Sequence, residues 1–367
     1  MKKKILIVIG TRPNFIKVTQ FKKEALKYTS LDLKIVHTGQ HYSSKMADVF
    51  FEQFDLVPDF FLNITQDSAI HQMAQIMTKL EELILTSYSP NLIIVVGDVN
   101  STLSAALVAN KLNIKLAHLE SGLRSFDRLM PEEHNRVLTD VITDFYFVTE
   151  QSGIDNLLKE GQNKDSVYFV GNTMIDTLVN FRTKIESSLI LKELSLSPND
   201  YVLMTMHRPA TVDETSGLLK LTELIEEITK HHKVVFPVHP RTLKNLEKSG
   251  LLERFETNKN IISIEPLDYF AFQQLILNCK FILTDSGGIQ EESTFLGVPC
   301  LTLRPNTERP ITCSIGTNTL IPFDLEIIKE QMSLIEKNQY KKGEIPELWD
   351  GKSTERIVNI ISQVLNA

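Results

Sequence analysis

The stretch FILTDSGGIQEESTFLGVPCL, residues 281–301, contains a complete strand–turn–helix–strand signal. A short apolar run ends in Thr-Asp-Ser-Gly-Gly, residues with helical spacing follow, and a second apolar run begins at Val298. Two parallel strands need a crossover connection, which is usually a helix. This stretch therefore predicts one unit of an α/β fold.

The same pattern recurs along the whole chain. Because the apolar runs do not alternate with polar residues, we expect parallel strands that are covered on both faces. The runs lie at 4–10, 33–39, 91–98, 114–120 and 144–149 in the first half, and at 201–207, 233–239, 260–266, 280–286 and 298–304 in the second.

Amphipathic segments separate the runs. One follows Asp67-Ser68, a good helix cap, and its predicted apolar stripe contains Ile70, Met73, Ala74, Met77, Leu80 and Ile84. A second stripe contains Leu218, Leu221, Leu224, Ile225 and Ile228. Spacings of three and four residues are typical of helices packed on one face.

A chain of 367 residues exceeds one ordinary core, and its strand–helix alternation continues through both halves. We predict two doubly wound, Rossmann-like domains with a central cleft, 1–180 and 181–352. The polar stretch 182–200 is the expected junction, and a last helix, 353–367, is expected to pack back onto the first domain.

The charge, the cysteines and the lengths of the apolar runs exclude several classes of protein. The net charge of −7 argues against non-specific nucleic-acid binding, which needs a basic surface. Three cysteines form neither a disulfide framework nor a zinc pattern. The first apolar run is too short for a signal peptide, and no stretch approaches a membrane span. A cytoplasmic protein that needs no membrane is expected.

The glycines at 287–288 stand where a strand passes into a helix. Glycine permits positive φ and close backbone approach to a ligand, and amides at a helix start attract phosphate. Glu291 or Glu292 could accept the hydroxyls of a ribose, so a nucleotide-sugar would satisfy both features. The alternative is a tight strand–helix turn with an acid that stabilises the helix dipole.

Other nucleotide fingerprints are missing: the sequence contains no P-loop pattern, and no G-x-G-x-x-G follows the first strand. GTRPNFIK (10–17) stands there instead. Arg12 suits bidentate phosphate contact, and Arg12 and Lys17 are expected to flank the cleft. A solvated strand end is the alternative for both.

Polar clusters follow several more strands: GDVNST (97–102), HLESGLRSFDRLMPEEHNR (118–136), MHRP (206–209), VHPR (238–241) and NTERP (306–310). We expect the acids mostly from the first half and the bases mostly from the second. Carboxylates gathered on one side of a cleft could serve as acid and base. Taken singly, each is more commonly a buried or capping carboxylate.

With these residues assembled, the sequence resembles the non-hydrolysing UDP-N-acetylglucosamine 2-epimerase family. The resemblance covers nearly the whole chain, and its motifs occur in the family's order: GTRPNFIK, HTGQHY, GDVNST, HLESGLRS, PEEHNR, HRP, PVHPR, DSGGIQEE, GVPCLTLR and NTERP. The resemblance implies a glycosyltransferase B-type fold and interconversion of UDP-GlcNAc and UDP-ManNAc without NAD or metal. It also implies a cytoplasmic homodimer that feeds polysaccharide synthesis.

The family mechanism implies roles for individual residues. UDP leaves as the C2 proton is removed, giving a 2-acetamidoglucal, and UDP re-adds after the proton returns to the opposite face. By resemblance, the catalytic residues are Asp98, Glu120, Glu132 and His207. The UDP-binding residues are Arg12, Lys17, Phe272, Ser286, Gly287, Gly288, Glu292 and Arg309. Which residue removes the C2 proton stays open.

Some positions depart from the family's common pattern: Asn14, Ser121, Pro209 and Ala210. The GTRPxFIK form also resembles epimerases of UDP-2,3-diacetamido uronic acids, so the sugar stays open. A second UDP-GlcNAc activates some members, and the residues near the matching positions are Gln40, Glu133, Arg208 and His239. A hydrolysing 2-epimerase, a transferase with a separate acceptor and a non-enzymatic nucleotide-sugar sensor are the other hypotheses.

Overall fold

The computed structural model describes residues 2–40, 51–65 and 67–366. The chain divides into two compact units. The first contains residues 1–180 and 347–367, and the second contains residues 181–346.

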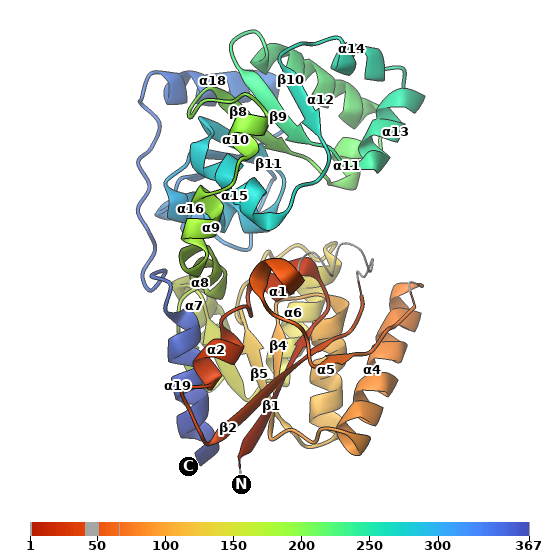
Figure 1. The fold of residues 1–367 in the computed structure, drawn as a ribbon, viewed down its shortest axis with the longest axis vertical. Coiled ribbons are helices and arrows are strands. Elements are labelled where there is room, and N and C mark those ends of the chain that lie inside the picture. The colour runs from red at the N-terminus through yellow and green to blue at the C-terminus, as the bar shows by residue number, and fades with distance from the viewer. Residues whose placement is uncertain (1, 41–50, 66, 367) are drawn as a thin grey trace. The chain divides into compact units, whose positions relative to one another are not determined.

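The first unit is built on a seven-stranded parallel sheet with the order β3-β2-β1-β4-β5-β6-β7 (Figure 1). The strands are β1 (Lys3–Ile9), β2 (Leu31–His37), β3 (Phe60–Phe61), β4 (Leu92–Val96), β5 (Lys115–Leu119), β6 (Phe145–Val148) and β7 (Val167–Phe169). All of β4 is buried, as expected for a central strand covered on both faces.

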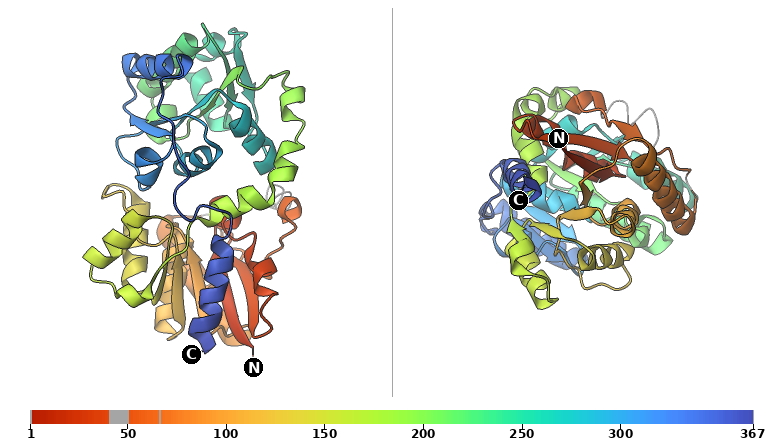
Figure 2. Two further views of the ribbon diagram at one scale, coloured as in Figure 1. Left: turned by 90° about the vertical axis from the view of Figure 1, so that its left-hand side faces the viewer. Right: turned by 90° about the horizontal axis from the view of Figure 1, so that it is seen from below.

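Helices cover both faces of this sheet. They are α1 (Arg12–Ile16), α2 (Phe21–Ala25), α4 (Ala69–Thr86), α5 (Asn100–Lys111), α6 (Pro131–Val141), α7 (Gln151–Lys159), α8 (Thr173–Asn180) and α19 (Ser353–Asn366), with a 3-10 turn at Lys164–Ser166. α5 contacts α4 and α6, whereas α19 contacts α2 and α8. Both termini therefore lie in this unit, as Figures 1 and 2 show.

Two contacts hold the returning chain on the first unit. The buried carboxylate of Asp176 accepts hydrogen bonds from the backbone amides of Ser353 and Thr354, at 3.0 and 2.5 Å, and so caps the start of α19. Burial raises the pKa of Asp176 despite these bonds. The buried Trp349 donates its indole N–H to the carbonyl of Thr149 at 3.0 Å.

The second unit contains a six-stranded parallel sheet with the order β10-β9-β8-β11-β12-β13. The strands are β8 (Tyr201–Thr205), β9 (Lys233–Pro237), β10 (Ile261–Ile264), β11 (Phe281–Thr284), β12 (Cys300–Leu303) and β13 (Asn318–Ile321). The helices are α9 (Arg182–Glu186), α10 (Ile190–Glu193), α11 (Pro209–Val212), α12 (Thr215–Ile228), α13 (Pro240–Lys248), α14 (Leu252–Glu256), α15 (Tyr269–Asn278), α16 (Gly287–Leu296), α17 (Ile311–Ser314) and α18 (Leu325–Glu336).

One apolar core lies on each face of the second sheet. The first contains side chains of α12, α13 and α18, and the second contains side chains of α10, α15 and α16. Cys279 and Cys300 belong to the second core, as expected of small apolar residues, and Cys313 is half-buried.

Both sheets have the strand order of a doubly wound fold, so the predicted fold class is confirmed. The ten predicted runs each contain a strand, whereas the short strands β3, β7 and β13 were missed. The predicted stripe on α12 is buried. On α4, however, Ile70 is 82% exposed. Ala74 is exposed too, because the buried row follows Gln72, Ile76, Leu80 and Ile84 at four-residue steps.

In doubly wound sheets, ligands bind outside the carboxyl ends of the strands where the strand order reverses. In the first unit this point lies between β1 and β4, and in the second it lies between β8 and β11. The carboxyl ends of β1 and β4 and those of β8 and β11 are therefore the expected ligand-binding points.

Candidate active site

Asn14 joins two strand ends at the reversal point of the first sheet. Its side-chain oxygen accepts hydrogen bonds from the amide of Gly10 and the hydroxyl of Thr11, at 3.2 and 3.1 Å. Its side-chain nitrogen donates to the carbonyl of Val96, the last residue of β4, at 3.1 Å. A carboxylate could not make this last bond, because an ionised carboxylate only accepts. The asparagine thus fixes the loop after β1 against the end of β4.

Glu120 follows β5 beside this point and forms an ion pair with Lys17. The Oε2–Nζ distance is 2.5 Å, and the side chains of Lys17 and Glu120 are only 6% and 4% exposed. Oε2 of Glu120 and Nζ of Lys17 also lie close to Gly97, the residue after β4. Oε1 of Glu120 is buried and has no hydrogen-bond partner within the described residues.

The backbone of Glu120 is strained. Its φ of +66° lies in the left-handed region, which a residue with a Cβ enters at a cost of about 1 kcal/mol or more. Such strain persists where the surrounding structure imposes it, and it clusters at functional sites. A buried, incompletely hydrogen-bonded carboxylate on a strained backbone is a candidate acid–base group.

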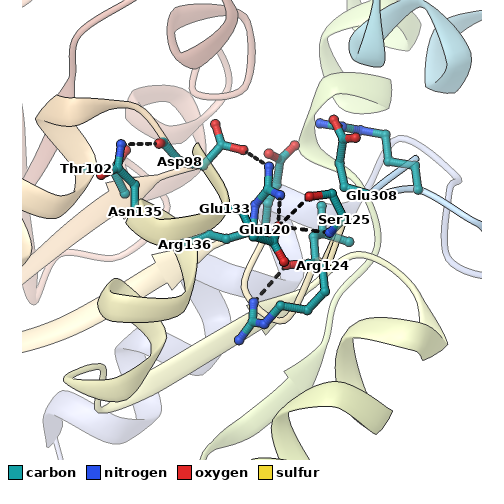
Figure 3. A network of polar contacts seen from close by, with 12 residues as sticks. Asp98, Thr102, Glu120, Arg124, Ser125, Glu133, Asn135, Arg136 and Glu308 are labelled. Atoms are coloured by element: carbon teal, nitrogen blue, oxygen red, sulfur yellow. Dashed lines mark hydrogen bonds and ion pairs between the residues drawn. The ribbon is translucent and has the colours of Figure 1, made fainter. Parts of the chain in front are cut away.

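Asp98 belongs to a second charge network, shown in Figure 3. The partly exposed Asp98 is paired with Arg136, which is also paired with Glu133. Glu133 accepts bonds from the amide and hydroxyl of Ser125, at 2.9 and 2.8 Å, and from the amide of Phe126 at 2.9 Å. Burial opposes the charge of Glu133, but these donors and Arg136 together lower its pKa. Glu133 therefore anchors the 125–126 loop and orients Arg136 toward Asp98.

A buried network supports the segments that carry Asp98 and Glu120. His118 contacts a carboxylate oxygen of Asp140 through Nδ1 and the carbonyl of Gly97 through Nε2, both at 2.7 Å. The second oxygen of Asp140 accepts from the amide of Gly122 at 3.0 Å and pairs with Arg124 at 2.7 Å. Burial opposes the charge of Asp140, yet His118 and Arg124 lower its pKa. One carboxylate thus ties together the chain beside Gly97 and the chain beside Gly122.

Two other predicted residues of this unit are exposed. Glu132 occupies the first turn of α6, where an acid stabilises the helix dipole. Arg12 is the first residue of α1.

Gln40, predicted near an activator site, is buried and accepts hydrogen bonds from the amide and hydroxyl of Ser101 at 3.0 and 2.7 Å. His41 and Tyr42 of the HTGQHY motif lie outside the described residues.

His207 and Asp285 pair at the reversal point of the second sheet. Nδ1 of His207 lies 2.6 Å from Oδ1 of Asp285, and the His207 side chain is 61% exposed while that of Asp285 is 1% exposed. Oδ2 of Asp285 accepts from the amides of His207 and Arg208 at 2.9 and 2.8 Å. Burial opposes the charge, but His207 and these amides lower the pKa of Asp285. The imidazole is therefore oriented through one nitrogen by a fixed anion.

The first turn of α16 follows Asp285 and Ser286 directly in the chain. Ser286 occupies the N-cap position without a side-chain cap, so the first amides of the helix lack that partner. Gly287 and Gly288 are helical, so neither uses the positive φ that glycine permits. The reason for glycine at 287 is space: an added Cβ would lie 2.8 Å from Oε1 of Glu308 and 3.0 Å from Nη1 of Arg309.

Buried charges surround this turn. Nε of Arg309 lies 2.7 Å from Glu291, and Nη1 contacts Glu308. Glu291 is thus an ion-pair partner of Arg309, and Glu292 is also buried on α16.

Phe272 lies on α15 and packs against the apolar core that α10, α15 and α16 form on one face of the second sheet. His239 is exposed and caps α13 by accepting from the amide of Arg241 at 3.2 Å.

The charge distribution differs from the expectation of acids in one half and bases in the other. In each unit, acids and bases are interleaved as ion pairs, because a buried charge needs a partner. Asp285 was not singled out from the sequence, although its place at the end of a strand beside Ser286 was a usable signal. Nothing in the sequence near Lys17 or near Glu120 indicated that these two residues form a pair.

Among the described residues, no group of three or more His, Cys, Asp or Glu side chains is arranged to hold a metal ion. None of the helices formed by these residues has the length and apolar character needed to cross a membrane.

Known proteins resemble this chain over its length. The chain is 41% identical over 366 residues to a UDP-N-acetylglucosamine 2-epimerase of Methanocaldococcus jannaschii, covering 98% of this chain and 99% of the relative. A crystal structure of the M. jannaschii UDP-GlcNAc 2-epimerase with UDP-GlcNAc and UDP has a TM-score of 0.87, with 40% identity and 98% and 99% coverage.

Two further similarities bear on the sugar and on the fold. A UDP-2,3-diacetamido-2,3-dideoxy-D-glucuronate 2-epimerase of Pseudomonas aeruginosa is 37% identical over 331 residues, which are 89% of this chain and 90% of the relative. Phytolacca americana UGT2, 15% identical with a TM-score of 0.62 over both full chains, shows the same glycosyltransferase B-type fold and no more.

The family model described as UDP-N-acetylglucosamine 2-epimerase matches residues 23–362. This match and the identities of 41% and 40% to two UDP-N-acetylglucosamine 2-epimerases over nearly the full chain settle the family. The chain belongs to the UDP-N-acetylglucosamine 2-epimerase family.

Proposed function

We propose that this chain is a UDP-N-acetylglucosamine 2-epimerase that interconverts UDP-GlcNAc and UDP-ManNAc without net hydrolysis. Its family membership supports the activity, as does its likeness to a structure that contains UDP-GlcNAc and UDP. The observation that carries the proposal is Glu120: a buried carboxylate on a strained backbone, paired with Lys17 beside the point where the strand order reverses.

The proposed reaction divides the work between two groups of residues. Amides of the α16 start, at Ser286–Gly288, bind the diphosphate together with Arg12 and Arg309, because a helix start and guanidinium groups both favour anions. Glu292 binds the ribose, and Phe272 lies against the uracil. Charge that leaves with the UDP group is thereby stabilised.

The carboxylates act on the sugar. The C2 proton is removed as the C1–O bond breaks, so the bonding electrons of C2–H form the C1–C2 double bond and UDP departs with the C1–O pair. Return of a proton to the opposite face of C2 and re-addition of UDP give the epimer. Asp98, Glu120, Glu132 and His207 are the proposed acid–base groups, and the oriented imidazole of His207 suits proton transfer.

The test is an incubation with UDP-GlcNAc in deuterated water, followed by NMR. We expect UDP-ManNAc with deuterium at C2, and the Glu120→Gln variant should lose this exchange whereas Glu81→Gln, an exposed change on α4, should retain it. Absence of both epimer and exchange in the wild type would eliminate UDP-GlcNAc as the substrate.

The second candidate is epimerisation of a UDP-2,3-diacetamido uronic acid, which the 37% identity to the P. aeruginosa enzyme favours. Offering both UDP-sugars to the same preparation and comparing kcat/KM separates the two. Stoichiometric release of UDP with free ManNAc would instead indicate hydrolysis, turnover that requires an added acceptor would indicate a transferase, and binding without turnover would indicate a sensor.

We also propose a homodimer in the cytoplasm that supplies surface-polysaccharide synthesis, with no nucleic-acid partner. The family resemblance supports this assembly. Light scattering on the eluate of a sizing column measures the mass, and a value near 41.8 kDa would mean a monomer. The proposed activator residues Gln40, Glu133, Arg208 and His239 predict that initial rates rise sigmoidally with UDP-GlcNAc.

A further inference from the structure

His118 is a buried histidine of the first unit whose ring joins two parts of the candidate site. It lies on β5 opposite Val95 of β4, and its side chain is 0% exposed. Nδ1 lies 2.7 Å from Oδ1 of Asp140, and Nε2 lies 2.7 Å from the carbonyl oxygen of Gly97. The ring therefore links α6 to the residue that follows β4, at the point where the strand order reverses.

Both groups that face the ring are acceptors. The carbonyl of Gly97 has no proton to give. Asp140 also accepts from the amide of Gly122 at 3.0 Å and pairs with Arg124 at 2.7 Å; although burial opposes its charge, His118 and Arg124 lower its pKa, so it is ionised. A neutral imidazole donates through one nitrogen only, whereas an imidazolium donates through both. Both bonds therefore form only if each ring nitrogen carries a proton.

The surrounding charges balance an imidazolium at this position. Arg124 pairs with Glu160 at 2.6 Å as well as with Asp140, so two anions face two cations, His118 and Arg124. The side chains of His118, Asp140 and Arg124 are at most 1% exposed. Charges at this depth persist where each has a partner, and the network supplies one for each of them.

The bond to Gly97 fixes the direction of one peptide group. Gly97 has a φ of +64°, and a residue without a Cβ changes its backbone conformation more easily than any other. In a planar trans peptide the C=O and the following N–H point in opposite directions. While the carbonyl is held on the buried ring, the amide of Asp98 therefore points away from the ring, and it bonds to no other backbone group of the described residues.

Two proposed acid–base groups depend on that peptide. Asp98 follows it directly, and a Cβ added at Gly97 would lie 3.6 Å from Oε2 of Glu120 and 3.7 Å from Nζ of Lys17. Reversal of the peptide would redirect Asp98 and would turn a carbonyl dipole out of the buried network. Displacement of a reacting group by about 1 Å costs on the order of 10²-fold in rate.

We propose that His118 is a positioning residue of the proposed epimerase reaction, on which this inference rests. Its imidazolium donates through Nε2 to the carbonyl of Gly97 and so holds the 97–98 peptide in the orientation that presents Asp98 to the sugar. The bond from Nδ1 to Asp140 orients the ring and supplies its counter-charge. His118 itself transfers no proton to or from the substrate.

Two substitutions separate the roles of the ring nitrogens. In His118→Gln the side-chain nitrogen takes the place of Nε2 and can still donate to Gly97. In His118→Asn it takes the place of Nδ1 and can donate only to Asp140. We expect His118→Gln to retain most of the wild-type kcat and His118→Asn to lose roughly tenfold to a hundredfold. The affinity for UDP, measured by calorimetry, should stay close to the wild-type value in both.

Stability distinguishes positioning from a purely structural role. Each variant removes one hydrogen bond and the charge of the ring, so urea unfolding followed by Trp349 fluorescence should show similar losses in both. His71→Asn, an exposed change on α4, is the control and should keep the wild-type kcat. Equal losses of kcat in the two His118 variants would overturn the proposal, as would a loss of UDP affinity in place of kcat.

Neutron diffraction from wild-type crystals grown in deuterated water tests the same bond if neither variant folds. We expect deuterium on both ring nitrogens of His118, and a bare Nε2 would overturn the proposal. The measurement also separates this inference from the proposed function. Inactive wild-type protein with deuterium on both nitrogens would refute the proposed function, whereas active wild-type protein with a bare Nε2 would refute only the role of His118.

Discussion

Replacing Lys17 and Glu120, singly and together, separates the stability of their ion pair from its chemistry. At 2.5 Å, two unit charges attract by about 7 kcal/mol at an effective dielectric constant of about 20. Desolvation opposes most of this attraction, but removing one partner leaves the other buried and unpaired. Lys17→Met and Glu120→Gln should each lower the free energy of unfolding of the first unit by about 3–5 kcal/mol.

The double variant Lys17→Met/Glu120→Gln should lose only about 1–3 kcal/mol, because no charge remains and one buried amide is imperfectly paired. The coupling energy should therefore be about 3 kcal/mol or more, within the range known for close charge pairs. Trp349, the single tryptophan, is buried in the first unit, so its fluorescence during urea unfolding reports on this unit.

Turnover should not follow stability in this series. Glu120→Gln and the double variant should both lose a factor of about 10²–10⁴ in kcat, the range for an acid–base group. A double variant as unstable as the sum of the single variants would refute the ion pair. Wild-type turnover in the double variant would refute the role of Glu120.

Four more changes test other parts of the site. Asp98→Asn should reduce kcat by about 10²–10⁴ with little change in UDP affinity, since it alters an acid–base group; an unchanged kcat would exclude that role. Arg309→Ala should weaken UDP binding by roughly tenfold or more in calorimetry, and unchanged affinity would remove it from the UDP site. Gly287→Ala should also weaken UDP binding, because its Cβ meets Glu308 and Arg309 at 2.8 and 3.0 Å; tighter binding would contradict this. Because folding lowers the pKa of Asp285, its ionised carboxylate stabilises the second unit at pH values above its ordinary pKa of 3.8. This stabilisation is lost as the pH falls through the lower pKa of the folded state. Asp285→Asn should thus be less stable at pH 7 and should show a shallower acid loss than the wild type; identical acid profiles would argue against an ionised Asp285.

The sequence by itself determined the fold class. Apolar runs without alternation are a local property of parallel strands covered on both faces, so the ten strands that lie in such runs were recoverable. β3 and β7 were missed because they have only two and three residues, and β13 was missed because it begins with two polar residues, Asn318 and Thr319. Ile70 was misplaced because a four-residue step of the buried row on α4 leaves it on the solvent side.

The sequence also placed polar residues at strand ends, and the family motifs selected most of the candidate site from them. Spacing could not show which of these residues meet. Lys17 and Glu120 are 103 positions apart and form a pair at 2.5 Å. His207 and Asp285 meet because β8 and β11 are neighbours in the sheet.

Tertiary structure alone decided the pairing of charges and the reason for glycine at 287. Strand order sets which chain ends become neighbours, and this order depends on long-range packing rather than on local spacing. A local pattern therefore predicts that a carboxylate lies at the end of a strand. Only the folded chain determines which cation faces that carboxylate, how deeply the pair is buried, and hence what chemistry it can perform.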